Sequence, residues 1–409
     1  MQSEATTGKR STSRFDPVKF VLDNTIRSPI RGVGAILLFC IFLIAANNII
    51  TGEYTFNRFV QNLIFGLSQG SIYALIALGY TLVYGILFMI NFAHGEVFMA
   101  GAFAGFFAIE AMNNSGFLQE QTALALLSVI LIGAIASMIV AVMLERIAYR
   151  PLRNAPRLVP LITAIGASIT LQELFKLLFG ASPKNFPTVN LFILPGVFGD
   201  LETLTLDGSE VGEGLFFLLQ PIFFMEQNMG IDLIDGLYTV NIIGLELRLR
   251  PITFIVMGFS LLVMAGLWFF IQRTKTGRAM RAVAEDKNTA SLMGINVDRV
   301  IVVTFILGGL LAGIGAVMFA LIPGGGQITP RMGFLPGIKA FTAAVVGGIG
   351  NVPGAMFGGL FLGVVEAVGP GLLGLDDQLK DVVAFGLLVF ILIFRPTGIF
   401  GEVVADKKV

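Results

Sequence analysis

The residues best able to do chemistry lie in one apolar stretch, between about Gly66 and Gly105. Lipid offers no hydrogen bonds, so polar side chains at membrane depth must find partners or line a water-filled path. Glycines recur along the stretch and allow helix backbones to approach closely. The pattern predicts a polar seam between packed membrane helices, and a transport path is the first hypothesis. Its polar members are Ser68, Gln69, Ser71, Tyr73, Asn91, His94 and Glu96.

Two interpretations of His94 and Glu96 stay open. They could form a structural pair that caps a helix at a turn, or they could join Asn91 in the path or its gate. A second pair, Glu173 and Lys176, is three residues apart on a predicted helix. That spacing predicts a mutually neutralising, structural ion pair near the outer end of the helix.

Composition sets the class of protein. The chain has 409 residues, of which 55% are hydrophobic and 13% charged, whereas a soluble domain has about 25% charged residues. The formal net charge is zero, which gives no indication of nucleic-acid binding. With one histidine and one cysteine, Cys40, neither a metal site nor an internal disulfide is expected. We predict an all-α polytopic membrane protein with about 8–10 transmembrane helices.

The N-terminal part carries a basic segment before an apolar one. Residues 1–31 are predicted to be a cytoplasmic tail under the positive-inside rule, and residues 32–57 to hold an extra transmembrane helix. A cleaved signal peptide is the alternative, because Ala45 and Ala46 follow a short apolar core.

Residues 58–180 form the first half of the predicted core. Spans are expected over 59–88, 90–112, 122–144 and 158–179, with a turn at Asn113–Ser115 and a basic cytoplasmic loop over 145–157. Residues 181–250 are acidic and are expected outside as an irregular or β-rich insertion, with a buried hairpin as the alternative.

Residues 251–400 form the second half, followed by a cytoplasmic tail over 401–409. Spans are expected over 251–271, 300–322 and 382–394. The cytoplasmic loop 272–298 predicts one helix over 279–293, ended by Gly294 at a cap position. Residues 337–369 exceed one span and contain Gly347–Gly354, which predicts a broken or re-entrant helix pair with Thr342 and Asn351 as candidate path residues.

Six short sequence motifs, in the same order along the chain, resemble those of the permease subunits of bacterial ABC importers for branched-chain amino acids. These importers contain two different permeases, called H-type and M-type, and the motifs resemble the H-type. The resemblance covers most of the chain from about Phe59 onward, apart from the acidic insertion. The motifs are NFAHGE at 91–96, ERIAYRPLR at 145–153, GRAMRAVAED at 277–286, MGINVDR at 293–299, KAFTAAVVGGIGNVPGA at 339–355 and RPTGI at 395–399.

The resemblance implies a multi-pass protein of the bacterial inner membrane, and the basic residues near both ends of the chain predict that both termini lie in the cytoplasm. It implies partners as well: a second permease that completes the path, two cytoplasmic ATP-binding subunits and an external substrate-binding protein. The residues that match the ATPase-coupling pattern are Ala284, Glu285, Asp286, Gly294 and Ile295. Taken without the resemblance, the same loop helix could also be a solvated connector.

No phosphate-binding Gly-x-x-x-x-Gly-Lys-Ser/Thr sequence is present, so we expect no enzymatic activity and no cofactor, with ATP hydrolysed by partners. The leading hypothesis is import of branched-chain or other neutral amino acids. A permease for urea or short amides is the second, although the segment from Ser71 to Tyr84 is closer to the amino acid type. A self-contained channel or ion-coupled carrier is the third, and it would have no use for the matched coupling helix.

Overall fold

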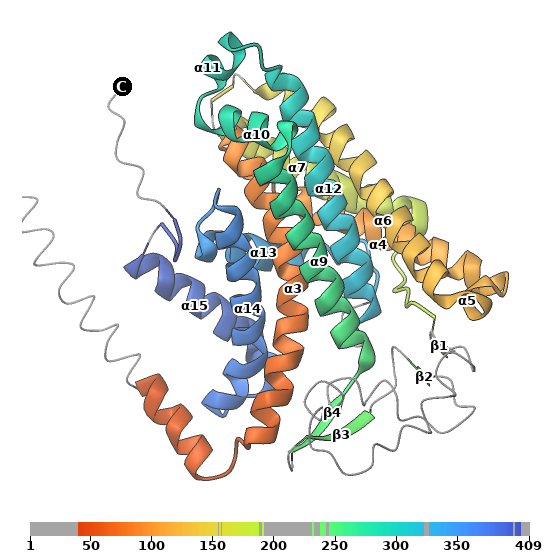
Figure 1. The fold of residues 1–409 in the computed structure, drawn as a ribbon, viewed down its shortest axis with the longest axis vertical. Helices are drawn as coiled ribbons and strands as arrows, with labels where there is room; N and C mark the ends of the chain where they lie inside the picture. Colours follow the sequence, from red (N-terminus) through yellow and green to blue (C-terminus); the bar gives the residue numbers. More distant parts are fainter. Residues whose placement is uncertain are drawn as a thin grey trace, which may run out of the picture.

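The computed structural model describes residues 40–153, 155–156, 158–187, 190–191, 231–232, 238–242, 245–322, 327–395 and 397–401. Its elements form a helical bundle (Figure 1). The helices are Cys40–Ile50, α3 (Phe56–Leu87), α4 (His94–Asn114), α5 (Phe117–Glu120), α6 (Thr122–Leu144), the π-helix η1 (Glu145–Tyr149), η2 (Arg150–Leu152), α7 (Leu158–Phe179), α9 (Pro251–Arg273), α10 (Lys275–Glu285), α11 (Lys287–Leu292), α12 (Val297–Leu321), α13 (Phe334–Gly347), α14 (Val352–Leu373), η4 (Asp377–Leu379) and α15 (Lys380–Phe394).

Seven helices in the described part are long and apolar enough to cross a membrane, which confirms the predicted all-α polytopic fold. The described part also has two shorter apolar helices, Cys40–Ile50 and α13. The predicted bounds of the spans over 122–144 and 158–179 match α6 and α7. Of the expected N-terminal span over 32–57, residues 32–39 lie outside the described residues, and the described helix ends at Ile50.

Helix α4 begins four residues later than expected. Phe88 adopts a left-handed conformation, with φ 57°, and its N–H donates to the Tyr84 carbonyl to close α3. Residues 88–93 therefore leave the helix, and Asn91 lies before α4 rather than within a span. At its other end α4 continues through Asn114, so the expected turn at 113–115 begins only at Ser115.

Helix α3 is the centre of the bundle: 89% of its most apolar 18-residue segment is buried, whereas only 17% of the corresponding segment of α7 is buried. It packs along α14 in an antiparallel pair (Figure 1). A Cβ atom on Gly363 would overlap the backbone of Gly70, and one on Gly359 would overlap Ala74. Small residues therefore let the two backbones touch, which is how membrane helices gain packing energy without a hydrophobic driving force.

The broken stretch predicted over 337–369 is confirmed. Helix α13 ends at Gly347, residues 348–351 are not helical, and α14 begins at Val352. The C-terminal segment covers the break, since the N–H groups of Ile399 and Phe400 donate to the carbonyls of Val346 and Gly347 at 2.7 and 3.2 Å. These bonds satisfy backbone groups that the missing helical turn leaves free.

The prediction of a single helix over 279–293 is wrong. The structure has two helices, α10 and α11, separated at Asp286, whose backbone is extended. The Asp286 carboxylate accepts hydrogen bonds from the N–H groups of Asn288 and Thr289 at 2.8 and 3.2 Å. An aspartate that caps the following helix outweighs the helix propensity of the alanine-rich sequence around it.

The described pieces of the acidic insertion form two small antiparallel sheets, in line with a β-rich excursion. Strands β3 (Tyr238–Ile242) and β4 (Leu245–Leu249) pair in one, and β1 (Asn190–Leu191) and β2 (Ile231–Asp232) pair in the other. Residues 192–230, including the short apolar patch at 215–225, lie outside the described residues. The β3–β4 sheet lies at the opposite end of the bundle from α10 and α11 (Figure 1).

Candidate functional site

A cluster of charged and polar side chains, here the lysine cluster, joins four helices. It consists of Gln69 and Tyr73 on α3, Lys339 on α13, Glu366 on α14 and Asp381 on α15. The Lys339 ammonium lies 2.7 Å from Glu366 Oε1 and 2.6 Å from Asp381 Oδ1. Tyr73 donates to the same Glu366 oxygen at 3.4 Å, and Gln69 donates to the Tyr73 hydroxyl at 2.6 Å.

The lysine cluster carries more negative than positive charge. One ammonium serves two carboxylates, and Glu366 Oε2 is buried without a hydrogen-bond partner among the described residues. The side chains of Lys339 and Glu366 are 4% and 1% exposed, while that of Asp381 is 37% exposed and opens the cluster to the surface. Ionisable groups at membrane depth are costly and usually mark a pathway.

Sequence reasoning named Gln69 and Tyr73 but missed Lys339, Glu366 and Asp381. The available signal was a lysine and a glutamate inside otherwise apolar helical runs, which a membrane-filling helix does not need.

A second cluster forms around Glu96, where α4 begins beside α7. Glu96 Oε1 accepts hydrogen bonds from Gln172 at 2.7 Å and from Ser168 at 3.1 Å. The rings of Tyr80 and His94 lie 4.7 Å apart, edge to face. Buried His94 Nε2 and Glu96 Oε2 have no hydrogen-bond partner in the described part of the chain.

The pairing of His94 with Glu96 that sequence suggested is replaced by contacts to other helices: Glu96 with α7, and His94 with Tyr80 on α3. The start of α13 approaches this cluster, because Gly333 packs directly on the backbone of Gly95. The start of α13 therefore lies against the start of α4, while Phe334 and Leu335 stay exposed.

Four further candidates for the path lie outside these two clusters. Asn91 Oδ1 accepts a hydrogen bond of 2.6 Å from Tyr149, which ties the 88–93 segment to η1. Ser68 and Thr342 are buried on α3 and α13. Asn351 lies at the helix break, where its Oδ1 accepts from Gly354 N–H at 3.2 Å and its Nδ2 donates to the Phe400 carbonyl at 3.0 Å. The eight predicted residues are therefore distributed over the two polar clusters and these four further positions.

The α10–α11 end carries the predicted coupling residues together. Glu285 and Asp286 are exposed at the junction of the two helices, Ala284 is half-buried beside them, and Gly294 ends α11 with φ +83°. The Ile295 N–H donates to the Ala290 carbonyl at 3.0 Å, which is the bond expected where a left-handed glycine closes a helix.

The apolar residues of this loop divide into two groups. Met280, Val283 and Ala290 are buried against the protein's own helices, whereas Leu292 and Met293 are 87% and 79% exposed. Adjacent apolar side chains so fully exposed at the end of a bundle are typical of a surface that a partner covers.

An ionic junction anchors this end to the first half of the chain. Arg153 pairs with Glu145 and with Asp298 at the start of α12. Lys287 on α11 lies 5.8 Å from the Phe88 ring centroid. Burial lowers the pKa of Lys287, and the nearby positive charge of Arg153 lowers it further. The ion pairs connect the basic loop to α12, and the Lys287–Phe88 contact connects α11 to the 88–93 segment.

Comparison with known proteins decides the class. Residues 62–392 match the model of the family described as the permease component of the branched-chain amino acid transport system. The chain belongs to this family. The matched residues include both polar clusters, the broken helix pair α13 and α14, and the α10–α11 loop. The match identifies the protein as a membrane permease subunit of a multi-subunit transporter.

Members of this permease family resemble the chain over nearly their whole length. The high-affinity branched-chain amino acid transport system permease protein BraD of Pseudomonas aeruginosa is 44% identical over 86% of this chain and 98% of its own. The LivH proteins of Salmonella typhimurium and Escherichia coli K12, named as permeases of the same transport system, are 40% and 39% identical with the same coverage. No solved structure matches the chain.

Proposed function

We propose that this chain is the H-type permease of an ATP-driven importer for branched-chain or other neutral amino acids in the bacterial inner membrane. The observation that carries the proposal is the family match over residues 62–392, together with the names of the relatives that cover the same region. The described part of the chain holds no group of side chains suited to a metal, and the energy for transport comes from ATP hydrolysed by partner subunits.

The path of the substrate follows the lysine cluster. An amino acid zwitterion carries one ammonium and one carboxylate, and the cluster offers both opposite charges at membrane depth. Asp381 is the accessible member, so the substrate reaches the cluster on the side of Asp381, with a second permease closing the face that α15 leaves open. Charges there cannot face lipid without a large cost, which supports placing the path or the second permease on this side.

The α10–α11 loop docks one of two cytoplasmic ATP-binding subunits. Exposed Leu292 and Met293 supply the apolar contact, and Glu285 and Asp286 supply the adjacent negative charge. This assignment places the α10–α11 end in the cytoplasm, in agreement with the basic residues of the 145–153 and 273–281 segments. The β3–β4 end then faces the external substrate-binding protein.

The test is reconstitution of this chain with the second permease, the ATP-binding subunits and the binding protein encoded beside it. We expect ATP-dependent uptake of leucine, isoleucine or valine into proteoliposomes, absent when the binding protein is omitted. Uptake of urea in place of amino acids would show that the chain is a permease for urea or short amides. Uptake that needs no ATP would make it an ion-coupled carrier.

A further inference from the structure

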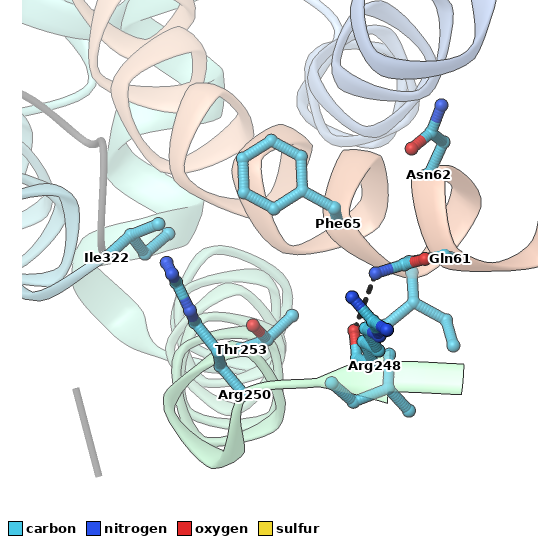
Figure 2. A pocket seen from close by; sticks show the side chains of 9 residues that line it. Gln61, Asn62, Phe65, Arg248, Arg250, Thr253 and Ile322 are labelled. Atoms are coloured by element: carbon cyan, nitrogen blue, oxygen red, sulfur yellow. Dashed lines mark hydrogen bonds between the residues drawn. The ribbon is translucent and has the colours of Figure 1, made fainter. Parts of the chain in front are cut away.

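A pocket of about 250 Å³ lies at the β3–β4 end of the bundle, between α3, β4 and the start of α9 (Figure 2). It is separate from the lysine cluster and from the α10–α11 loop. Two arginines line it together with amide, hydroxyl and apolar side chains. Its lining residues are Gln61, Asn62, Ile64, Phe65, Arg248, Leu249, Arg250, Thr253 and Ile322.

The described residues that line the pocket give it a positive charge. Neither Arg248 nor Arg250 has an ion pair with a described residue, and no acidic side chain is among the described residues that line the pocket. Arg250 Nε is buried and has no hydrogen-bond partner in the part of the chain that the structure describes. A buried guanidinium donor without an acceptor is costly, so the site is suited to an anion.

Helix α9 adds to this preference. Arg250 is its N-cap residue and makes no capping side-chain bond, and the first turn contains no acidic residue. The N-terminus of α9, which carries partial positive charge, therefore lies at a site that already holds two guanidinium groups. Helix N-termini and arginines are the two features by which proteins most often bind phosphate groups.

The side chains around the pocket indicate which kind of molecule carries the phosphate. Phe65 lines the pocket from α3, and Phe254 lies in the first turn of α9; they are 41% and 44% exposed. Exposed aromatic side chains on membrane-spanning helices face lipid, so acyl chains would lie along them while the head group enters the pocket. The volume suits a head group and is below the roughly 300–1,000 Å³ of pockets that enclose whole drug-sized ligands.

We propose that this pocket binds the phosphate of an anionic phospholipid, of the phosphatidylglycerol type, at the outer membrane surface. Arg250 is the main ligand, with Arg248 and the N-terminus of α9 contributing charge. The bound lipid would join α3 to α9 and β4, elements otherwise connected at this end by the hydrogen bond from Gln61 to the Arg248 carbonyl (Figure 2). The proposal does not depend on which substrate is carried.

The experiment compares lipid retention and thermal stability of the purified full-length chain with phosphatidylglycerol and with phosphatidylcholine. Native mass spectrometry counts bound lipid, and a thermal melt measures stabilisation. For the wild-type protein we expect selective retention of phosphatidylglycerol and a higher melting temperature with it. Arg250→Gln should weaken that retention about tenfold, because a hydrogen bond to a charged group has that effect. Arg250→Lys should keep part of it.

The matched control is Arg273→Gln, at the opposite end of the same helix. It removes one positive charge but should leave retention at the wild-type level. Equal loss in both variants would reduce the effect to general charge and overturn the site. Equal stabilisation by inorganic phosphate without lipid would overturn the lipid assignment. Retention that Arg250→Gln leaves unchanged in a folded protein would overturn the proposal altogether.

Discussion

The ammonium nitrogen of Lys339 lies 2.7 Å from Glu366 Oε1, and both side chains are buried between α13 and α14. The pair joins the two arms of the broken helix at a level far from the break itself. Because Asp381 contacts the same nitrogen, α15 is included in this connection. A buried ion pair contributes little net stability, but loss of one partner leaves the other charge uncompensated.

Lys339→Met should therefore destabilise the protein by about 3–5 kcal/mol, the usual cost of leaving a buried charge without its partner. Thermal unfolding of the purified protein measures the change. Lys380→Met is the control, because Lys380 is exposed on α15, and it should stay within about 0.5 kcal/mol of wild type. Similar stability of the two variants would contradict a buried, charged Lys339.

The double variant Lys339→Met/Glu366→Met separates folding from transport. Apolar replacement of both partners is often neutral or stabilising, so the double variant should regain the stability that the single change loses. Substrate uptake should nevertheless stay at background, because only Asp381 remains of the three charges proposed to meet the zwitterion. Normal uptake by the double variant would restrict the lysine cluster to a structural role.

Gly294→Val should reduce transport and substrate-stimulated ATPase activity together while the protein stays in the membrane. No atom lies within 4 Å of the Cβ that the change adds, so the effect comes from the backbone, whose φ of +83° is strained for valine. Gly258→Val on α9 is a matched control, because its Cβ also meets open space and its φ is not positive. If both variants transport normally, α11 is only a connector.

Asn351→Leu should impair transport more than Asn114→Leu. The change removes the cap of α14, which costs about 1 kcal/mol, and it releases the Phe400 carbonyl from the helix break. Asn114 is exposed at the end of α4 and should tolerate replacement. Uptake rates at matched expression give the comparison. Equal tolerance at both positions would remove the capped break from the transport mechanism.

Single cysteines test the orientation of the bundle. In a Cys40→Ser background, Arg146→Cys on η1 and Glu120→Cys at the end of α5 should react with a membrane-impermeant thiol reagent from opposite sides. Both positions are exposed, so access does not limit the reaction. The cysteine at 146 should be labelled only from the cytoplasm. Labelling of both from one side would contradict the assignment of the two ends.

The spans were predictable because length and apolarity determine what can cross a bilayer, and α6 and α7 begin and end where those runs do. The broken helix was predictable for a similar local reason, since Gly347–Gly354 contains glycines and a proline that interrupt any helix. The cap at Gly294 also follows from local chemistry.

Contacts between distant residues were not predictable from one sequence. Lys339 donates a hydrogen bond to Glu366, which is 27 positions away in the sequence, and Asn91 accepts one from Tyr149, which is 58 positions away. Nothing in the local pattern names such partners, because they depend on which helix faces align. The break at Asp286 was missed for a different reason. The Asp286 carboxylate caps α11, and this local interaction outweighs the helix propensity of the residues around it.

The direct backbone contact between α3 and α14 limits how the protein can change shape. Where a glycine on one helix fills the only space left by the other, neither helix can slide or turn without collision. These two helices must therefore travel as one rigid body. Helix α13 is joined to the same body, because a Cβ on Gly358 would overlap the Ala343 carbonyl and because Lys339 pairs with Glu366. Any alternation between outward and inward access therefore has to be carried by elements outside these three helices.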